Sequence, residues 1–272
     1  MPNPSETRRV KGLVRHTLDQ LLLVDLLRYA VVAARYLWFV ILRQSLRTFD
    51  ASAANQAAVA THTVSHNLKG LRDLAVNRSH LLVRPLSVIE ALSVDADVLS
   101  IGPRSEGELF NLAAHGFVLA RIRGLDLISY SPRVSLGDMH AAPFEADSFD
   151  AVILGWVLAY SEDRRLAASE VVRITRRGGI VAAGVEYSPQ SVDEIEAELG
   201  YQPGSRSRIA SCAEILSYFG EAVDHVYYQH TVAARDRGRS TRRAIRPPAG
   251  DARQGEGVHR ALQGAREPCR AG

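Results

Sequence analysis

The sequence predicts an α/β fold: a doubly wound, mostly parallel sheet preceded by an all-helical extension and followed by a disordered tail. From Asp95 onward, short apolar runs alternate with glycine-containing turns and amphipathic stretches, a pattern typical of successive βαβ units. Apolar positions in residues 1–90 recur at helical spacing instead. The segment after Ala234 is rich in Arg, Gly and Pro and has no apolar periodicity. We therefore expect three parts, at residues 1–90, 91–233 and 234–272.

The elements of the α/β part are predicted from the length and pattern of each apolar run. We expect strands at Asp97–Ile101, Ile122–Leu125, Asp150–Leu154 and Gly179–Val185. We expect helices at Ser105–His115, Arg164–Thr175, Val192–Leu199 and Ala213–Phe219. An apolar run at Val223–His230 could add a last strand, and Arg84-Pro85 should break the preceding helix.

The stretch between Asp126 and Asp138 is short for a parallel sheet. Only 11 residues separate the two carboxylates, too few for a full helix and a further strand. Either that helix is absent and a turn at Ser129–Pro132 replaces it, or the sheet has one element fewer.

Composition limits the partners and the compartment. The formal charge is +3, but residues 235–272 hold ten Arg against four acidic residues, so the basic character belongs to the tail. The tail lacks interleaved aromatic residues, and we expect no nucleic-acid partner. Cys212 and Cys269 form no ligand motif, and His62 and His66 have no third ligand, so we expect no metal and a cytoplasmic protein.

An apolar stretch at residues 18–46 admits three interpretations. The first, a membrane span, is disfavoured: a span needs roughly 20 mostly apolar residues in sequence, and Asp25, Arg28 and Arg35 interrupt this stretch. A long helix that packs on its own domain or on a partner is the simplest interpretation. The alternative is peripheral membrane contact, with arginines near the headgroups and Trp38 in the acyl boundary.

Four motifs follow one another along the α/β part. The first, Val98–Glu108, runs from a buried strand through Gly102 into a helix. The second ends the next strand at Asp126, the third covers residues 137–154, and the fourth is the turn and strand at residues 175–181. A strand-turn-helix brings backbone N–H groups to a nucleotide, and a carboxylate after the next strand can accept hydrogen bonds from ribose hydroxyls. The motifs therefore predict a nucleotide site at the carboxyl ends of the strands.

These motifs, in this order, resemble the class I S-adenosylmethionine-dependent methyltransferases, whose sheet is Rossmann-like. The resemblance is strongest to the type 11-like group, through Gly137-Asp138, Pro143-Phe144, Ser148-Phe149-Asp150 and Arg177-Gly178-Gly179. It covers residues 95–187 and does not extend to the helical extension or the tail.

The resemblance implies S-adenosylmethionine as cofactor and a role for several residues. Gly102 would be the turn glycine beneath the methionine and ribose, and Asp126 the ribose ligand. Asp138 and Met139 would flank the adenine. Gly155 would lie at the mouth where cofactor and acceptor meet.

The first glycine motif is degenerate by the standard of this family. Ser100 replaces the usual acidic residue, and Arg104 replaces the second glycine. Glu106 or Glu108 could supply the missing carboxylate for the methionine ammonium, and we assign Glu106. Either could equally be a first-turn helix residue favoured by the helix dipole.

No catalytic residue stands out, which suits a displacement that depends on alignment of the reactants. His140, Tyr160 and Glu186 are the candidates for a catalytic role, by position only. The resemblance thus implies methyl transfer to a small molecule. The alternative is a binding or scaffold protein without turnover, supported by Ser100 and Arg104. A nicotinamide dehydrogenase is disfavoured because no GxGxxG is present.

Overall fold

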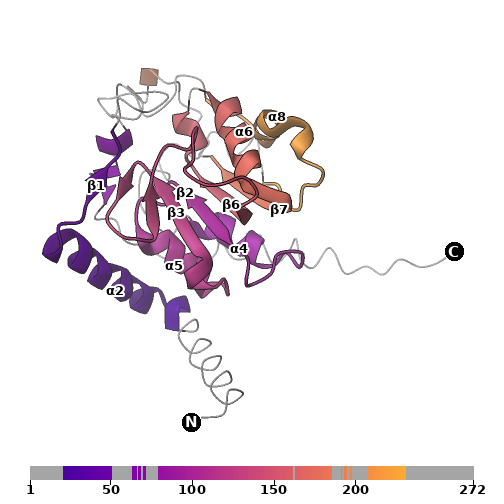
Figure 1. Cartoon of the computed structure of the whole chain (residues 1–272). Coiled ribbons are helices and arrows are strands. Elements are labelled where there is room, and N and C mark those ends of the chain that lie inside the picture. Colours follow the sequence, from indigo (N-terminus) through magenta and orange to yellow (C-terminus); the bar gives the residue numbers. More distant parts are fainter. Residues whose placement is uncertain are drawn as a thin grey trace, which may run out of the picture. The chain divides into compact units, whose positions relative to one another are not determined.

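The core of the protein is a five-stranded parallel sheet in the order β5-β3-β2-β6-β7 (Figure 1). The computed structural model describes residues 21–50, 63–65, 67–68, 70–71, 79–161, 163–185, 191, 193–194, 197 and 208–230. The strands are β2 (Val98–Ile101), β3 (Ile122–Asp126), β5 (Val134–Leu136), β6 (Phe149–Gly155) and β7 (Thr175–Gly184). The predicted α/β fold and parallel sheet are therefore confirmed.

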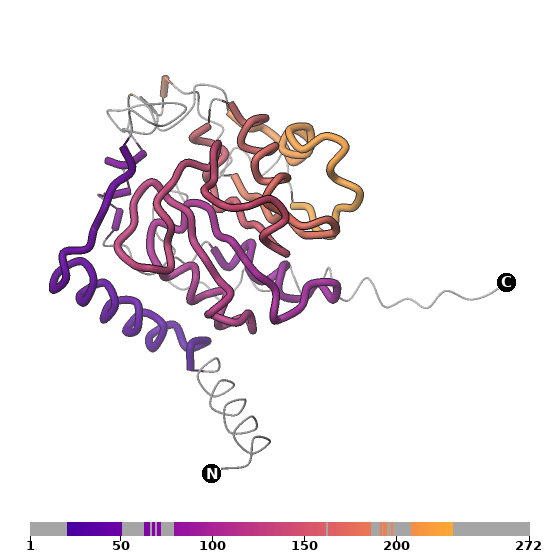
Figure 2. The backbone as a smooth tube through the Cα atoms, in the orientation of Figure 1, coloured from indigo at the N-terminus to yellow at the C-terminus, as the bar shows by residue number. Residues whose placement is uncertain are grey.

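Helices cover both faces of the sheet, as a doubly wound fold requires (Figures 1 and 2). One face packs against α4 (His80–Ser87) and α5 (Glu106–Ala114), through Val98, Ile122 and Ile153. The other packs against α6 (Arg164–Ile174) and α8 (Cys212–Phe219), through Leu99, Val152 and Leu154. Short 3₁₀ turns lie at η4 (Leu119–Arg121), η5 (Leu158–Tyr160) and η6 (Gly220–Ala222). Successive residues of β2 and β6 point to opposite covered faces, so every residue of β2 and all of β6 except Asp150 are buried.

The N-terminal helix lies against α5. Helix α2 (Asp25–Tyr36) continues into a π-helical turn, η1 (Leu37–Leu42), and Val32 packs against Phe110 of α5. The helix stops where Gln44 adopts a φ of 49° and Ser45 Oγ donates to the Phe39 carbonyl at 2.7 Å. The chain then enters β1 (Arg47–Thr48), which pairs antiparallel with β4 (Ile128–Ser129).

The connection between β3 and β5 contains no helix. These strands are parallel neighbours, yet residues 127–133 join them by way of β4 and a turn. A buried cluster of Leu71, Ile128 and Tyr130 forms there, and side chains of η1 and its neighbours, including Phe39 and Val40, pack against it. The N-terminal segment therefore covers a region that a crossover helix would otherwise cover, and the sheet keeps its strand.

Three expectations are wrong. Residues 43–50 contain β1 and no helix, because this segment pairs with β4. Helix α4 runs through Arg84-Pro85: Pro85 costs the helix one backbone hydrogen bond, and only Leu86 and Ser87 follow it before the helix ends. No strand forms at Val223–His230, where side chains such as Tyr227 and Tyr228 are exposed and have no sheet face to bury against. The predicted disorder after residue 233 and most of Val192–Leu199 lie outside the described residues.

A cluster of charges holds the amino ends of three strands together. The Arg176 guanidinium lies 3.1 Å from Asp97 Oδ2 and 2.7 Å from Asp150 Oδ2. Asp97 N donates to Asp150 Oδ2 at 2.8 Å. Burial acts to raise the pKa of Asp150, but the hydrogen bonds from Arg176 and Asp97 outweigh it and lower that pKa. The cluster lies at the edge opposite to the expected nucleotide site.

We expect Arg176→Ala to lower the free energy of unfolding by about 1 kcal/mol at pH 7, because these charges are partly exposed. A carboxylate whose folded pKa is depressed stabilises the fold above its ordinary pKa, and this stabilisation is lost as the pH falls through the depressed value. The difference from wild type should therefore shrink by about pH 3. Urea unfolding at both pH values tests this, with the exposed neighbour in Arg177→Ala as control. A difference that stays constant with pH would contradict the assignment.

Candidate methyl-transfer site

The carboxyl ends of four strands bring the predicted nucleotide residues to one edge of the sheet. Gly102 follows β2 and donates its N–H to the Leu125 carbonyl at 2.8 Å. Asp126 ends β3 and is in register with Leu136, two residues before Asp138. Gly155 ends β6, the strand on the other side of β2. Motifs that are far apart in the sequence thus lie close together at one edge of the sheet.

Gly102 stands at a place that only glycine fits. Its φ is 73°, and an added Cβ would lie 2.0 Å from Val157 Cγ1. Two residues later, Arg104 also adopts a left-handed φ, 54°. This conformation aims its backbone N–H at Asp126 Oδ2, at 2.8 Å. Arg104 therefore adopts a conformation that favours glycine, and its strained backbone orients a donor.

The Asp126 carboxylate is buried and surrounded by donors. Besides Arg104 N, it accepts hydrogen bonds from Asn67 Nδ2 at 3.0 Å and from Ile128 N at 3.3 Å. Burial raises the pKa of Asp126, and the hydrogen bonds oppose that rise only in part. Asn67 comes from the N-terminal part of the chain, and no sequence motif pointed to it.

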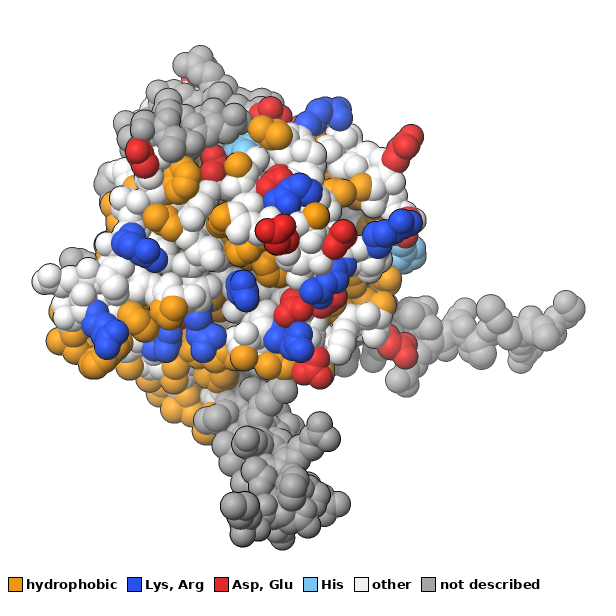
Figure 3. Space-filling view, in the orientation of Figure 1, with side chains coloured by type: hydrophobic (Ala, Val, Ile, Leu, Met, Phe, Trp, Pro, Cys, Tyr) orange, Lys and Arg blue, Asp and Glu red, His pale blue; other side chains and the backbone are white. Residues whose placement is uncertain are grey.

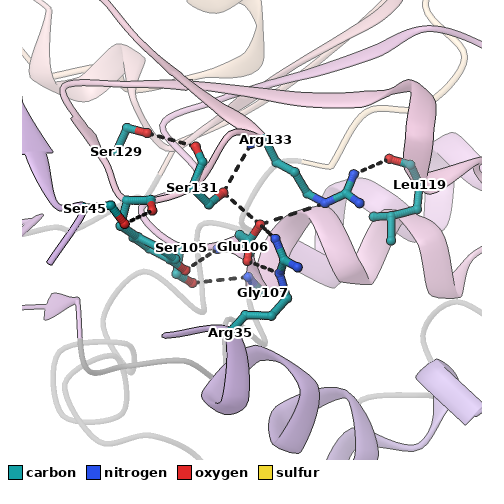
Figure 4. Close-up of polar contacts among 10 residues, drawn as sticks. Arg35, Ser45, Ser105, Glu106, Gly107, Leu119, Ser129, Ser131 and Arg133 are labelled. Carbon is teal, nitrogen blue, oxygen red and sulfur yellow. Dashed lines mark hydrogen bonds and ion pairs between the residues drawn. The ribbon is translucent and has the colours of Figure 1, made fainter. Parts of the chain in front are cut away.

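Glu106 faces the N-terminal helix (Figure 4). Its oxygens accept from Arg35 Nε at 2.5 Å, Arg35 Nη2 at 2.8 Å and Ser131 Oγ at 2.8 Å. The hydrogen bond to Glu106 raises the pKa of Arg35 against the effect of burial. The Glu106 backbone N–H donates to the Tyr130 hydroxyl at 2.9 Å, and burial raises the pKa of Tyr130 to about 12. Both carboxylate oxygens of Glu106 are thus engaged by protein groups.

Glu108 faces the sheet edge instead. Ser100 Oγ donates to its carboxylate, and an added Cβ on Gly155 would lie 3.4 Å from each of its oxygens. The side chain is buried between the ends of β2 and β6. Helix α5 therefore brings a carboxylate to the carboxyl end of β2, beside Ser100.

Asp138 belongs to a buried chain of polar groups. Its Oδ1 lies 2.6 Å from His140 Nδ1 and accepts the His140 backbone N–H at 3.0 Å. The other ring nitrogen of His140 lies 2.7 Å from Ser161 Oγ. The chain ties the loop after β5 to the loop after β6, and Ser161 carries no signal in the sequence that would have revealed this. Met139 packs partly buried against the neighbouring apolar cluster.

Residues 101–183 match a protein-family profile described as "Methyltransferase domain". This part of the chain belongs to that family. No curated protein sequence matches the chain.

Solved structures resemble the methyltransferase domain at low identity. A Galdieria sulphuraria protein named as a sarcosine dimethylglycine methyltransferase is 17% identical, with a TM-score of 0.42, over 56% of this chain and 62% of that one. A Haloferax volcanii protein named as a methyltransferase, solved with the activator Trm112, is 23% identical, with a TM-score of 0.44, over 57% and 73%. A geranyl diphosphate methyltransferase in complex with SAM is 18% identical, with a TM-score of 0.38, over 58% and 68%. This chain thus spans less than two thirds of the Galdieria protein.

The loop after β6 contains one further predicted residue, Tyr160, and a strained turn at Trp156. Tyr160 is half-buried in η5. Trp156 is buried and has a φ of 66°. Its backbone N–H is shared between the Leu154 and Gly184 carbonyls, at 3.0 Å each. Such a strained turn is common at functional sites. Glu186 lies outside the described residues, and no cluster of three or more metal-binding side chains is present among the described ones.

We expect Arg35→Met to lower the free energy of unfolding by about 3 kcal/mol, because it leaves the Glu106 carboxylate buried without its cation. Arg35→Met/Glu106→Gln should recover most of that loss, since the double variant removes both charges. Urea unfolding of both variants and wild type measures this. If the double variant is less stable than Arg35→Met, the pair is not the source of the loss.

Proposed function

We propose that the protein is an S-adenosylmethionine-dependent methyltransferase that acts on a small-molecule acceptor. The observation that supports this most is the pair of buried carboxylates, Asp126 and Glu108, on either side of the Gly102 turn within a methyltransferase domain. Both lie at the edge where ligands bind in parallel α/β sheets.

The chemistry of this pair suits the cofactor. S-adenosylmethionine presents two donor groups, a ribose diol and an ammonium, and carboxylates accept from both. We assign Asp126 to the diol, following the family resemblance. We assign Glu108 to the ammonium in place of Glu106, because Glu106 is occupied by Arg35 and Ser131. Asp138 and Met139 keep their assignment beside the adenine, with His140 and Ser161 holding Asp138 in place.

The proposed reaction needs alignment more than acid-base catalysis. The bound cofactor supplies a methyl group that its sulfonium already activates. The protein has to hold an acceptor in line with that methyl, and positioning of this kind contributes roughly 7–11 kcal/mol to a barrier. Gly155 and Tyr160, which border the end of β6, would lie nearest the acceptor. Glu186 is the candidate for removing its proton, because both ring nitrogens of His140 are engaged by Asp138 and Ser161.

A binding protein without turnover is the second candidate. Two contacts favour it: Asn67 donates to the carboxylate that a ribose would need, and Val157 packs against Gly102. In this alternative the protein keeps the methyltransferase fold, but the side chains of Asn67 and Val157 occupy the place of the ligand.

Calorimetry with S-adenosylmethionine and S-adenosylhomocysteine separates these candidates. We expect both ligands to bind the full chain, and a radiolabelled methyl group to be transferred to a component of a small-molecule extract. No binding of either ligand at millimolar concentration would refute the enzyme. Binding without any transfer would favour the second candidate.

Glu108→Gln tests the assignment of the ammonium ligand. The substitution keeps the size and the hydrogen-bonding ability of the side chain but removes its charge, so we expect the cofactor to bind at least about tenfold more weakly, since a charged hydrogen bond is worth about 1.5–3 kcal/mol. Calorimetry measures the affinity, and Glu221→Gln, an exposed carboxylate in η6, is the matched control. Unchanged affinity in a folded Glu108→Gln protein would show that Glu108 is not the ligand of the ammonium.

A further inference from the structure

The outer side of the N-terminal helix is an exposed apolar surface. We call it the outer helix face and define it by Leu23, Leu26, Leu37, Trp38, Ile41 and Leu42. Leu26 is 74% exposed, Leu42 64% and Ile41 53%. Figure 3 shows orange side chains gathered along this region, where α2 lies in Figure 1, with a row of blue basic side chains beside them. Single exposed leucines are ordinary, whereas a contiguous patch indicates an interaction site.

The two arginines of this helix point away from the outer helix face. Arg28 is buried and donates to the Leu22 carbonyl at 2.8 Å and to Asp25. Arg35 reaches inward to Glu106. A helix at a water-facing surface would place its charges outward and its leucines inward. Here both arginines serve the interior, and Asp25 is the one exposed charge among residues 21–42.

Basic charge is concentrated next to the outer helix face. Arg43 and Arg47 follow the helix and are exposed, and the Arg43 guanidinium lies 5.2 Å from the centre of the Trp38 ring. Residues 1–50 contain eight Lys and Arg against four Asp and Glu, whereas residues 51–234 contain 15 against 22. The positive charge therefore belongs to the same part of the chain as the apolar surface, which is complementary to an anionic and apolar partner.

We propose that the outer helix face docks on an anionic phospholipid bilayer, with the helix lying in the interface. Leucines would enter the boundary between headgroups and acyl chains, Trp38 would sit at headgroup level, and Arg43 and Arg47 would meet lipid phosphates. The helix lies on the bilayer and does not cross it: among the described residues, no helix has the length and apolarity to reach from one side to the other. The docking does not depend on cofactor binding.

Flotation of the full chain with vesicles tests the proposal. We expect the protein to float with vesicles of phosphatidylcholine and phosphatidylserine, and less with phosphatidylcholine alone or in high salt, which screens the arginines. Arg43→Gln/Arg47→Gln should weaken binding to the anionic vesicles by about fivefold for each arginine removed.

A triple variant, Leu26→Gln/Ile41→Gln/Leu42→Gln, tests the apolar contribution. These side chains are exposed, so the thermal unfolding midpoint should stay close to that of wild type while flotation is lost. Leu166→Gln/Val172→Gln is the matched control, because it removes exposed apolar side chains from α6 on the opposite face of the sheet. The control should float like wild type.

Three results would overturn the proposal. The first is wild-type protein that does not float with anionic vesicles, and the second is a triple variant that floats as well as wild type. The third is a dimer that does not bind vesicles and becomes monomeric in the triple variant, as judged by light scattering after gel filtration. That result would identify the outer helix face as a contact between two copies of the chain. Both measurements are made without cofactor, so they are independent of the calorimetry.

Discussion

The position of the N-terminal helix depends on neutralising one buried carboxylate, that of Glu106. A charge removed from water costs several kcal/mol unless a partner and further hydrogen bonds compensate for it. Arg35 and Ser131 provide that compensation, and no solvent reaches the Glu106 side chain. Because Arg35 lies on α2 and Glu106 on α5, the ion pair ties the two helices together beside the contact between Val32 and Phe110.

The first turn of α5 serves two regions at once. Residues two apart on a helix point in different directions, so Glu106 meets the N-terminal helix while Glu108 meets the sheet edge. Ser105 caps this turn by accepting from Gly107 N at 3.3 Å. A shift of α2 would therefore move Glu106, and through the same helical turn it would move Glu108, a carboxylate of the proposed cofactor site.

Local patterns in the sequence were sufficient for the sheet but not for the contacts across it. Short, largely apolar runs predicted β2, β3 and β6, and motif spacing predicted that Gly102, Asp126 and Asp138 share an edge. Side-chain partners far apart in the sequence carry no periodicity, so Asn67 beside Asp126 and Ser161 beside His140 were not foreseen. Our proposal of Glu108 in place of Glu106 depends on a contact of the same kind, that of Glu106 with Arg35, which is 71 residues away in the sequence.

Because the connection at residues 127–133 contains no helix, the part of the chain that matches the family profile differs from the part that must fold together. The family profile begins at residue 101, but the apolar cluster around Ile128 and Tyr130 is completed by side chains from before residue 72. A fragment cut at the family boundary would expose that cluster to water and lose one wall of its core. The unit that unfolds cooperatively should therefore be larger than the unit recognised by sequence similarity. Its N-terminal residues take the place of the helix that is absent between β3 and β5.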